Sequence, residues 1–207
     1  MKFLYRSKTI IFILGFIFAS CGSSSKIVIY DSQIQIPVTN FLYSQDLIYS
    51  PDGNISARIP DGWLIVTPQQ KSDNANIFAV VCDPDYRYML TFTELPYNDV
   101  KVISSGIDII SLTMGTLKWR KKRFIGNIEL IEDPSEINIK SKTFGAFTYS
   151  SDSSVTIIRS GIFNTQINGT QKLYECMLTQ IPNKYKPLPS NVEIISIHKV
   201  ILNGIKW

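Results

Sequence analysis

The sequence predicts an α+β domain in which a mostly antiparallel sheet packs against two helices. Three observations support this prediction: many short β-rich segments, one long mid-chain segment with helical spacing of apolar residues, and a second such segment near the C-terminus. The chain has 207 residues, of which 44% are hydrophobic and 18% charged, so it can bury one ordinary core. This composition excludes a chain that is mainly disordered or of low complexity.

The first twenty residues have the features of an export signal. Met1 to Lys8 carries three basic residues and no acidic residue, and Ile10 to Ala19 is an uncharged apolar run. A run of about ten residues suits the core of a signal peptide, whereas a membrane-spanning helix needs about 20. The run ends in Ala19-Ser20-Cys21, which a tract of glycine and serine follows.

The residues around Cys21 resemble the lipobox of bacterial lipoproteins, although Phe18 stands where that pattern favours leucine. The resemblance implies that residues 1–20 are removed and that Cys21 becomes an acylated first residue, anchored in a membrane by its acyl chains. Gly22, in place of an aspartate, and the lack of an acidic run after the tether favour the outer membrane, facing the periplasm. The alternative is an ordinary secretory signal with Cys21 retained by chance.

Removal of the signal also removes most of the net charge. The formal charge of +4 includes three basic residues of the signal, and without them 18 basic residues stand against 17 acidic ones. A net charge near +1 does not support binding to nucleic acid, so we expect no nucleic-acid partner.

We divide the chain into the signal peptide (1–20), a lipidated cysteine with tether and arm (21–50), and the folded domain (51–207). The arm from Lys26 to Ser50 contains short alternating apolar stretches. Two interpretations stay open: a spacer or docking segment, and an N-terminal edge strand packed on the domain.

Turn residues separate the expected strands of the domain. Asp61-Gly62 favours a tight turn, and Asn168-Gly169 favours a two-residue hairpin that places Ile167 opposite Thr170 and Gly161 opposite Cys176. Strands are expected at 56–59, 63–67, 77–82, 88–95, 128–132, 136–140, 143–150, 155–164 and 171–180.

The mid-chain helix is predicted over Val100–Trp119, where apolar residues recur at steps of three and four. Asn98 or Asp99 is expected to cap its start, and basic residues crowd its end.

The C-terminal helix is predicted from about Asn191 to Leu202. Ser190 and Glu193 have the spacing of a capping box, and Gly204 is placed to end the helix.

The run from Ile59 to Trp63, the two helices and the closing Trp207 together resemble the PsbP-like fold over roughly Ser50 to Trp207. The resemblance implies an α+β sandwich of accessory proteins that bind and stabilise protein complexes and are mostly not enzymes. Fold alone does not determine function.

Cys82 and Cys176 are the cysteines that remain after lipidation of Cys21. In the oxidising cell envelope they are a possible disulfide pair. Each also lies in an apolar strand, where a reduced thiol packs as a small hydrophobic residue. Both alternatives stay open at this stage.

A cluster of cations ends the mid-chain helix. It is either a surface for anionic lipid or an acidic partner, or a solvated helix end that complements the helix dipole. Its members are Lys118, Arg120, Lys121, Lys122 and Arg123.

No catalytic constellation is apparent. His198 is the single histidine, and its neighbours in sequence place it at the boundary between the buried and wet faces of the C-terminal helix. The acidic Asp83-Pro84-Asp85 segment is expected to be a polar turn rather than a calcium loop. We predict no catalytic residues, no metal and no cofactor.

The sequence therefore favours a lipid-anchored, non-enzymatic envelope protein that contacts the membrane through its acyl chains and binds or stabilises a membrane-associated protein complex. The alternative is a periplasmic carrier of a small ligand or lipid, which the aromatic-rich strands and Met114 and Met177 motivate. A hydrolase that uses His198 is a weaker third hypothesis.

Overall fold

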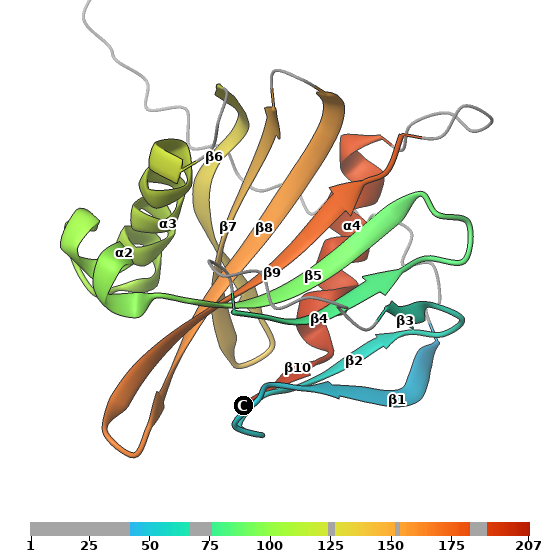
Figure 1. The fold of residues 1–207 in the computed structure, drawn as a ribbon, viewed down its shortest axis with the longest axis horizontal. Helices are drawn as coiled ribbons and strands as arrows, with labels where there is room; N and C mark the ends of the chain where they lie inside the picture. Colours follow the sequence, from blue (N-terminus) through green and yellow to red (C-terminus); the bar gives the residue numbers. More distant parts are fainter. Residues whose placement is uncertain (1–41, 67–75, 124–126, 152–153, 183–189) are drawn as a thin grey trace, which may run out of the picture. The chain divides into compact units, whose positions relative to one another are not determined.

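The computed structural model describes residues 42–66, 76–123, 127–151, 154–182 and 190–207 (Figure 1). The export signal, Cys21, the tether and the alternating stretches of the arm up to residue 41 lie outside these residues. The elements in chain order are β1 (Tyr43–Tyr49), β2 (Ser56–Pro60), β3 (Leu64–Val66), β4 (Asn76–Cys82), β5 (Tyr88–Leu95), α2 (Tyr97–Ile103), α3 (Ile109–Arg123), β6 (Ile128–Ile139), β7 (Lys142–Ser151), β8 (Ser154–Ile167), β9 (Thr170–Gln180), α4 (Asn191–Asn203) and β10 (Ile205–Lys206).

The strands form two antiparallel sheets, which confirms the predicted α+β class. The large sheet has the order β3-β4-β5-β9-β8-β7-β6, and the small sheet has the order β1-β2-β10. β1 pairs with β2 and lies at the edge of the small sheet. Residues 43–49, at the end of the arm, therefore form an edge strand packed on the domain, which is the second of the two interpretations of the arm.

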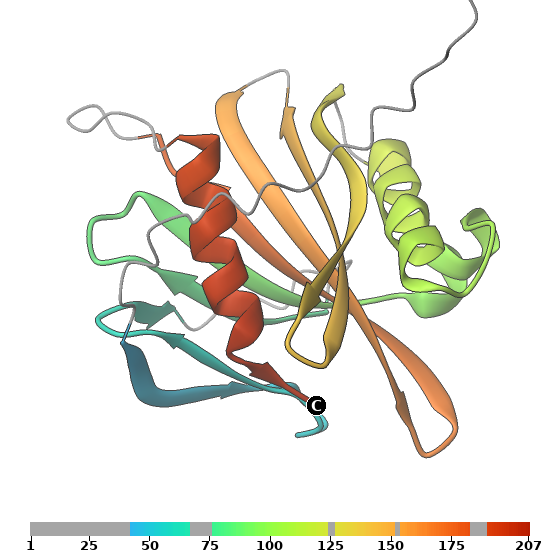
Figure 2. The ribbon, with the colours of Figure 1, turned by 180° about the vertical axis from the view of Figure 1, so that it is seen from behind.

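Helices cover opposite faces of the large sheet. α4 lies across one face, together with the small sheet (Figures 1 and 2). On the other face α3 lies over β6 to β8, and α2 packs beside α3 and contacts β9. Because successive side chains of a strand point to opposite faces, each strand contributes to two separate cores. On β9, for example, Leu173 joins the core under α2 and α3, and Tyr174 joins the core under α4.

The hairpin between β8 and β9 has the predicted register. Ile167 pairs with Thr170, and Gly161 pairs with Cys176. Asn168 and Gly169 both have positive φ, of 49° and 78°, which is the backbone that a two-residue hairpin loop needs.

The predicted continuous helix over Val100–Trp119 is wrong, because the structure has two helices with a break at 104–108. Asp108 starts the second helix, since its Oδ1 accepts the amide of Ser111 at 2.9 Å and its Oδ2 accepts the Ser111 hydroxyl at 2.7 Å. Those hydrogen bonds lower the pKa of Asp108. The N-cap of α2 is Pro96, with no side-chain cap, rather than Asn98 or Asp99.

Two predicted strand boundaries also change. The predicted strands 128–132 and 136–140 are one strand, β6, whose pairing with β7 shifts register around Glu132. The Asp61-Gly62 turn is present, with φ of 78° at Gly62, but it connects a strand of the small sheet to a strand of the large sheet. Local turn chemistry predicts the bend and cannot predict which sheet each strand joins.

The C-terminal helix follows its prediction closely. The Ser190 hydroxyl accepts the Glu193 amide at 3.2 Å, and Gly204 follows the last helical residue. The Glu193 carboxylate does not complete the capping box, because it pairs with Arg87 at 3.1 Å. Within the residues that the structure describes, no helix is both long and apolar enough to cross a membrane.

Candidate functional site

The basic cluster at the end of α3 divides into residues that point inward and residues that point outward. Arg120 is half-buried, and its guanidinium forms a bidentate ion pair with Glu175 on β9. The other four cations of the cluster, which are Lys118, Lys121, Lys122 and Arg123, are exposed. The sequence alone does not distinguish Arg120 from its neighbours.

Glu175 is a buried carboxylate in the middle of the sheet. Its side chain has no exposed surface, and its Oε1 accepts hydrogen bonds from Arg120 Nε at 3.1 Å and from the Ser160 hydroxyl at 2.7 Å. Burial by itself lowers the pKa of Arg120, but the Glu175 carboxylate outweighs it, and the pKa lies above its usual value. The pair therefore fixes the last turn of α3 on the sheet.

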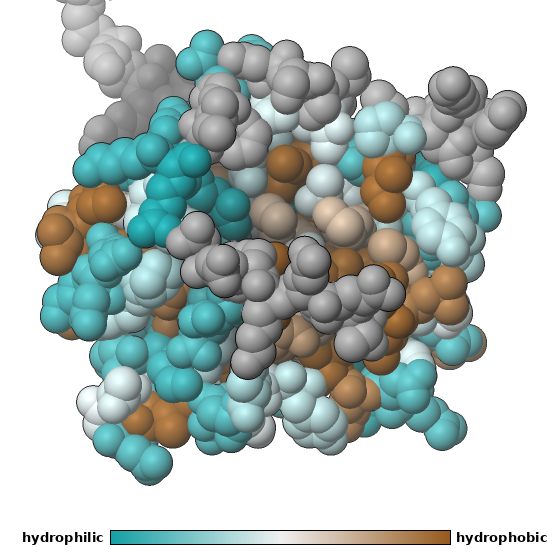
Figure 3. Space-filling view, in the orientation of Figure 1, coloured by the Kyte–Doolittle hydropathy of each residue, from teal (hydrophilic) through white to brown (hydrophobic). Residues whose placement is uncertain are grey.

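Arg123 is held by weaker contacts at the surface. Its guanidinium lies 4.6 Å from the centroid of the Trp119 ring and 3.5 Å from a carboxylate oxygen of Asp99 on α2. Both members of this ion pair are half-exposed, so solvent screens it. Hydrophilic residues gather at the upper left of Figure 3, where α2 and α3 lie. Lys118, Lys121 and Lys122 of α3 are exposed cations.

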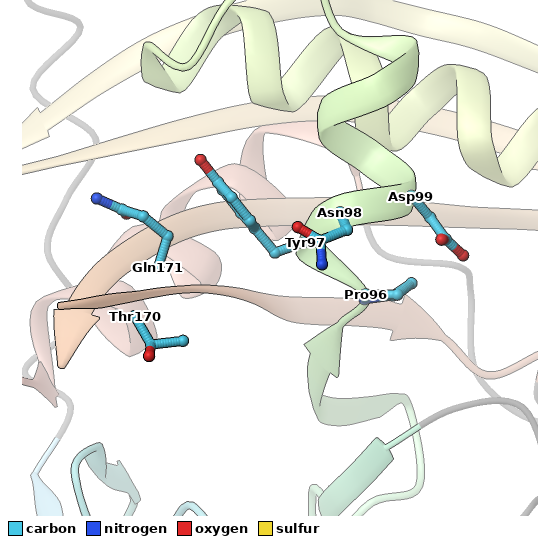
Figure 4. Close-up of a pocket in the computed structure, with 6 residues that line it drawn as sticks. All are labelled: Pro96, Tyr97, Asn98, Asp99, Thr170 and Gln171. Carbon is cyan, nitrogen blue, oxygen red and sulfur yellow. The ribbon is translucent and has the colours of Figure 1, made fainter. Parts of the chain in front are cut away.

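A cavity of about 420 Å³ lies beside this surface, between α2 and the start of β9 (Figure 4). Four of the six lining residues have polar, non-aromatic side chains, and Tyr97 contributes a ring that extends toward Gln171. Asp99 links the cavity to the basic cluster through its ion pair with Arg123. The lining residues are Pro96, Tyr97, Asn98, Asp99, Thr170 and Gln171.

His198 lies in the core and not at the predicted boundary between buried and wet faces. It has no exposed surface, and its Nε2 is 3.0 Å from the carbonyl oxygen of Cys176. Gly161 makes room for the ring, since a Cβ at that position would lie 2.7 Å from His198 Cε1. Burial, with a smaller effect from Arg159, lowers the pKa of His198 to about 3. A neutral, enclosed imidazole is poorly placed to exchange protons with a substrate.

The two cysteines are free thiols on different strands. Cys82 pairs with Met89 on β5, and Cys176 pairs with Phe92 on the other side of β5. A strand lies between them, which separates their Cα atoms by at least about 10 Å, beyond the roughly 7 Å that a disulfide spans. They also face opposite sides of the sheet, because Cys176 and Val81 both belong to the core under α4. The disulfide alternative is therefore wrong.

The acidic segment after β4 forms a polar turn. The Asp83 Oδ1 accepts the amides of Arg87 and Tyr88 at 2.5 and 2.7 Å, which closes the connection to β5. Among the residues that the structure describes, no three His, Cys, Asp or Glu side chains gather in a group that could hold a metal ion.

Comparison with solved structures finds similar folds at low sequence identity. The solution structure of cyanobacterial PsbP (CyanoP) from Synechocystis matches with a TM-score of 0.51 and 13% identity, over 78% of this chain and 91% of that chain. A mutant form of the protein Mog1 matches with a TM-score of 0.47 and 11% identity, over 78% and 94%. LpqN of Mycobacterium tuberculosis, which is involved in cell envelope biogenesis, matches with a TM-score of 0.46 and 11% identity, over 81% and 92%.

No protein-family model and no curated protein sequence matches the chain. The similarity to CyanoP identifies the fold as a PsbP-like α+β sandwich, which confirms the fold that the sequence resemblance implies. At 13% identity the similarity extends to the fold alone.

Sequence reasoning missed Glu175, Ser160 and the inward role of Arg120. The available signal was a single acidic residue inside the otherwise apolar stretch around Cys176. A buried carboxylate needs a cationic or hydrogen-bonding partner, but the partner on α3 is 55 residues away in sequence and only the fold brings it close.

Replacing Arg120 by methionine is expected to lower the free energy of unfolding by about 3–5 kcal/mol, because it leaves the Glu175 carboxylate buried without its cation. Urea unfolding measures this loss. Arg123→Met is the matched control on the same helical turn and should cost less than about 1 kcal/mol, since its ion pair is exposed. Equal losses in the two variants would contradict the assigned role of the pair, and Arg120→Met/Glu175→Leu should recover much of the stability.

The low pKa of His198 predicts a pH-dependent loss of stability. Between its ordinary pKa of 6.5 and about 3 the unfolded chain binds a proton on His198 that the folded chain does not. Stability due to this group is therefore complete above 6.5 and falls on acidification, by up to about 1.4 kcal/mol per pH unit.

The test compares urea unfolding of the parent and His198→Gln from pH 7 to about pH 4. Carboxylates with lowered pKa, such as Asp52 and Asp108, make the stability of both proteins depend on pH to the same extent. The free energy of unfolding should therefore fall less steeply on acidification in His198→Gln than in the parent. A nuclear magnetic resonance titration of the His198 ring in the parent provides the second readout. Parallel stability curves, or a ring that titrates near neutral pH, would refute the prediction.

Proposed function

We propose that this protein is a lipid-anchored, non-enzymatic protein of the cell envelope that binds a membrane-associated protein partner through the exposed lysines at the end of α3. The observation that supports the proposal is that one cation of the basic cluster points inward whereas its lysines are exposed. Arg120 is fixed inside by Glu175, and Lys118, Lys121 and Lys122 point outward from the same turns.

The buried ion pair makes this turn a positioned surface. Because Arg120 is held by Glu175 and Ser160 supports the carboxylate, the last turns of α3 have a defined place on the sheet. Lysine side chains on a positioned helix favour a partner with a complementary acidic surface, and such charges act mainly on association rate and specificity. The interaction should weaken with added salt.

The non-enzymatic part of the proposal rests on residue chemistry. The chain has one histidine, which lies in the core under α4, and its sequence has no Gly-x-Ser-x-Gly nucleophile motif. A PsbP-like fold is compatible with this proposal and does not require it.

The anchoring part rests on the sequence before the described residues. Cys21 follows a short apolar run and precedes a glycine–serine tract, as in lipoproteins. Acylation there would hold the domain close to a bilayer, facing the periplasm from the outer membrane, and would raise its effective concentration near membrane-associated partners.

The carrier alternative is less well supported for a lipid. Four of the six residues that line the described cavity have polar, non-aromatic side chains, whereas a lipid chain needs a continuous apolar surface. Met114, which motivated this alternative, is 44% exposed on α3 and lines no part of that cavity.

Anchoring predicts that native protein fractionates with membranes and that mass spectrometry finds acyl chains on Cys21. Cys21→Ser should release the protein into the soluble fraction, because it removes the acylated thiol. Cys82→Ser is the matched control and should leave fractionation unchanged. An unmodified Cys21 in membrane-extracted protein would overturn the anchor.

Docking predicts that crosslinking and affinity purification from solubilised membranes recover a reproducible protein partner. The triple variant Lys118→Gln, Lys121→Gln, Lys122→Gln should bind it about tenfold more weakly, given roughly 0.5 kcal/mol for each exposed charge contact.

A charge-matched control separates this surface from net charge. Lys140, Lys199 and Lys206 are exposed elsewhere on the domain, and their replacement by glutamine should leave partner binding unchanged. Equal losses in the two triple variants would contradict the docking surface. If the α3 variant loses only binding to vesicles of anionic lipid, the surface contacts the membrane and the protein-docking proposal is wrong.

A further inference from the structure

The cavity between α2 and β9 combines hydrogen-bonding side chains with apolar surface. Its volume of about 420 Å³ falls within the roughly 300–1,000 Å³ of small-molecule sites. The amides of Asn98 and Gln171 and the hydroxyl of Thr170 can each donate and accept hydrogen bonds. A ligand that matches these side chains needs several groups that also both donate and accept hydrogen bonds.

The charged side chains at the cavity already interact with other groups of the protein. Of the described residues that line the cavity, Asp99 alone is charged, and Arg123 pairs with it at 3.5 Å. Lys101 lies 5.7 Å from the centroid of the Tyr97 ring and is engaged there. Among the six described residues that line it, the cavity therefore offers neither an unpaired carboxylate for a cation nor a cation for an anion, which favours a neutral ligand.

One acceptor of a lining residue has no donor. The Oε1 atom of Gln171 is buried and makes no hydrogen bond. A buried acceptor without a donor is unfavourable, and a rotation of the Gln171 side chain toward the cavity would bring its amide to a hydroxyl of a bound molecule. Across the hairpin, Gln166 pairs in register with Gln171 but is exposed and lines no part of the cavity.

Tyr97 adds a flat apolar surface to these polar groups. Its ring extends from α2 toward Gln171, as Figure 4 shows, and it packs in part on the core under α2 and α3. An aromatic ring beside amide and hydroxyl groups matches a molecule with apolar C–H faces and a rim of hydroxyl groups. We propose that this cavity binds a neutral sugar unit of a glycan.

The test titrates the full-length protein with two neutral disaccharides, N,N′-diacetylchitobiose and maltose, and follows binding by nuclear magnetic resonance. Saturable binding of either sugar is expected, with a dissociation constant of about 1 mM and the largest shifts at Tyr97, Asn98 and Gln171. Binding of N,N′-diacetylchitobiose alone would show that the site selects sugars with acetamido groups, and binding of maltose alone would show that it selects sugars with hydroxyl groups only.

Gln171→Leu should weaken sugar binding about tenfold, because it removes the side-chain amide that would turn toward the sugar while keeping a similar shape. The variant loses an unsatisfied polar atom, so it should fold at least as stably as the parent. Gln166→Leu on the facing strand is the matched control and should bind as the parent does.

Two outcomes would overturn the sugar site: no saturation with either disaccharide, or an equal loss of affinity in the two glutamine variants. Neither outcome bears on the docking surface, since the glutamine variants keep Lys118, Lys121 and Lys122.

Discussion

The ion pair between Arg120 and Glu175 is the constraint on which the arrangement of the candidate surfaces depends. A carboxylate with no exposed surface is unfavourable unless a cation and hydrogen-bond donors accompany it, and here α3 supplies the cation and β8 supplies the Ser160 hydroxyl. The pair joins α3 to both strands of the β8–β9 hairpin, because Ser160 lies on β8 and Glu175 on β9. It thereby determines which side chains of a highly basic turn remain exposed.

The central strand β9 shows how one segment serves two opposite faces. Glu175 points toward α3, and Cys176, the next residue, points into the core under α4, where its carbonyl oxygen meets the ring of His198. Gly161 on the neighbouring strand is compatible with that ring because it has no side chain. The sheet is thus packed on both sides, with a charged pair on one face and a neutral buried imidazole on the other.

Sequence patterns predicted the elements that depend on local chemistry. The β8–β9 hairpin, its register and the start of α4 follow from Asn168-Gly169 and from Ser190, whose geometry is set within a few residues. The prediction of a single mid-chain helix was wrong because the apolar spacing continues across residues 104–108, although Asp108 begins a new helix there. When two consecutive helices contact the same core, the periodicity of apolar residues does not predict where the chain breaks between them.

The sequence by itself determined the α+β class and the order of most strands, since each depends on composition, local turns or contiguous residues, and it predicts the lipidation of Cys21 on the same kind of local evidence. Only the tertiary structure decided that Arg120 points inward, that His198 is enclosed, that Cys82 and Cys176 lie on opposite faces, and that Tyr97 and Gln171 share a cavity. Each of these facts joins residues far apart in the chain. Their contact depends on sheet order and on the face of each strand, which local interactions do not specify.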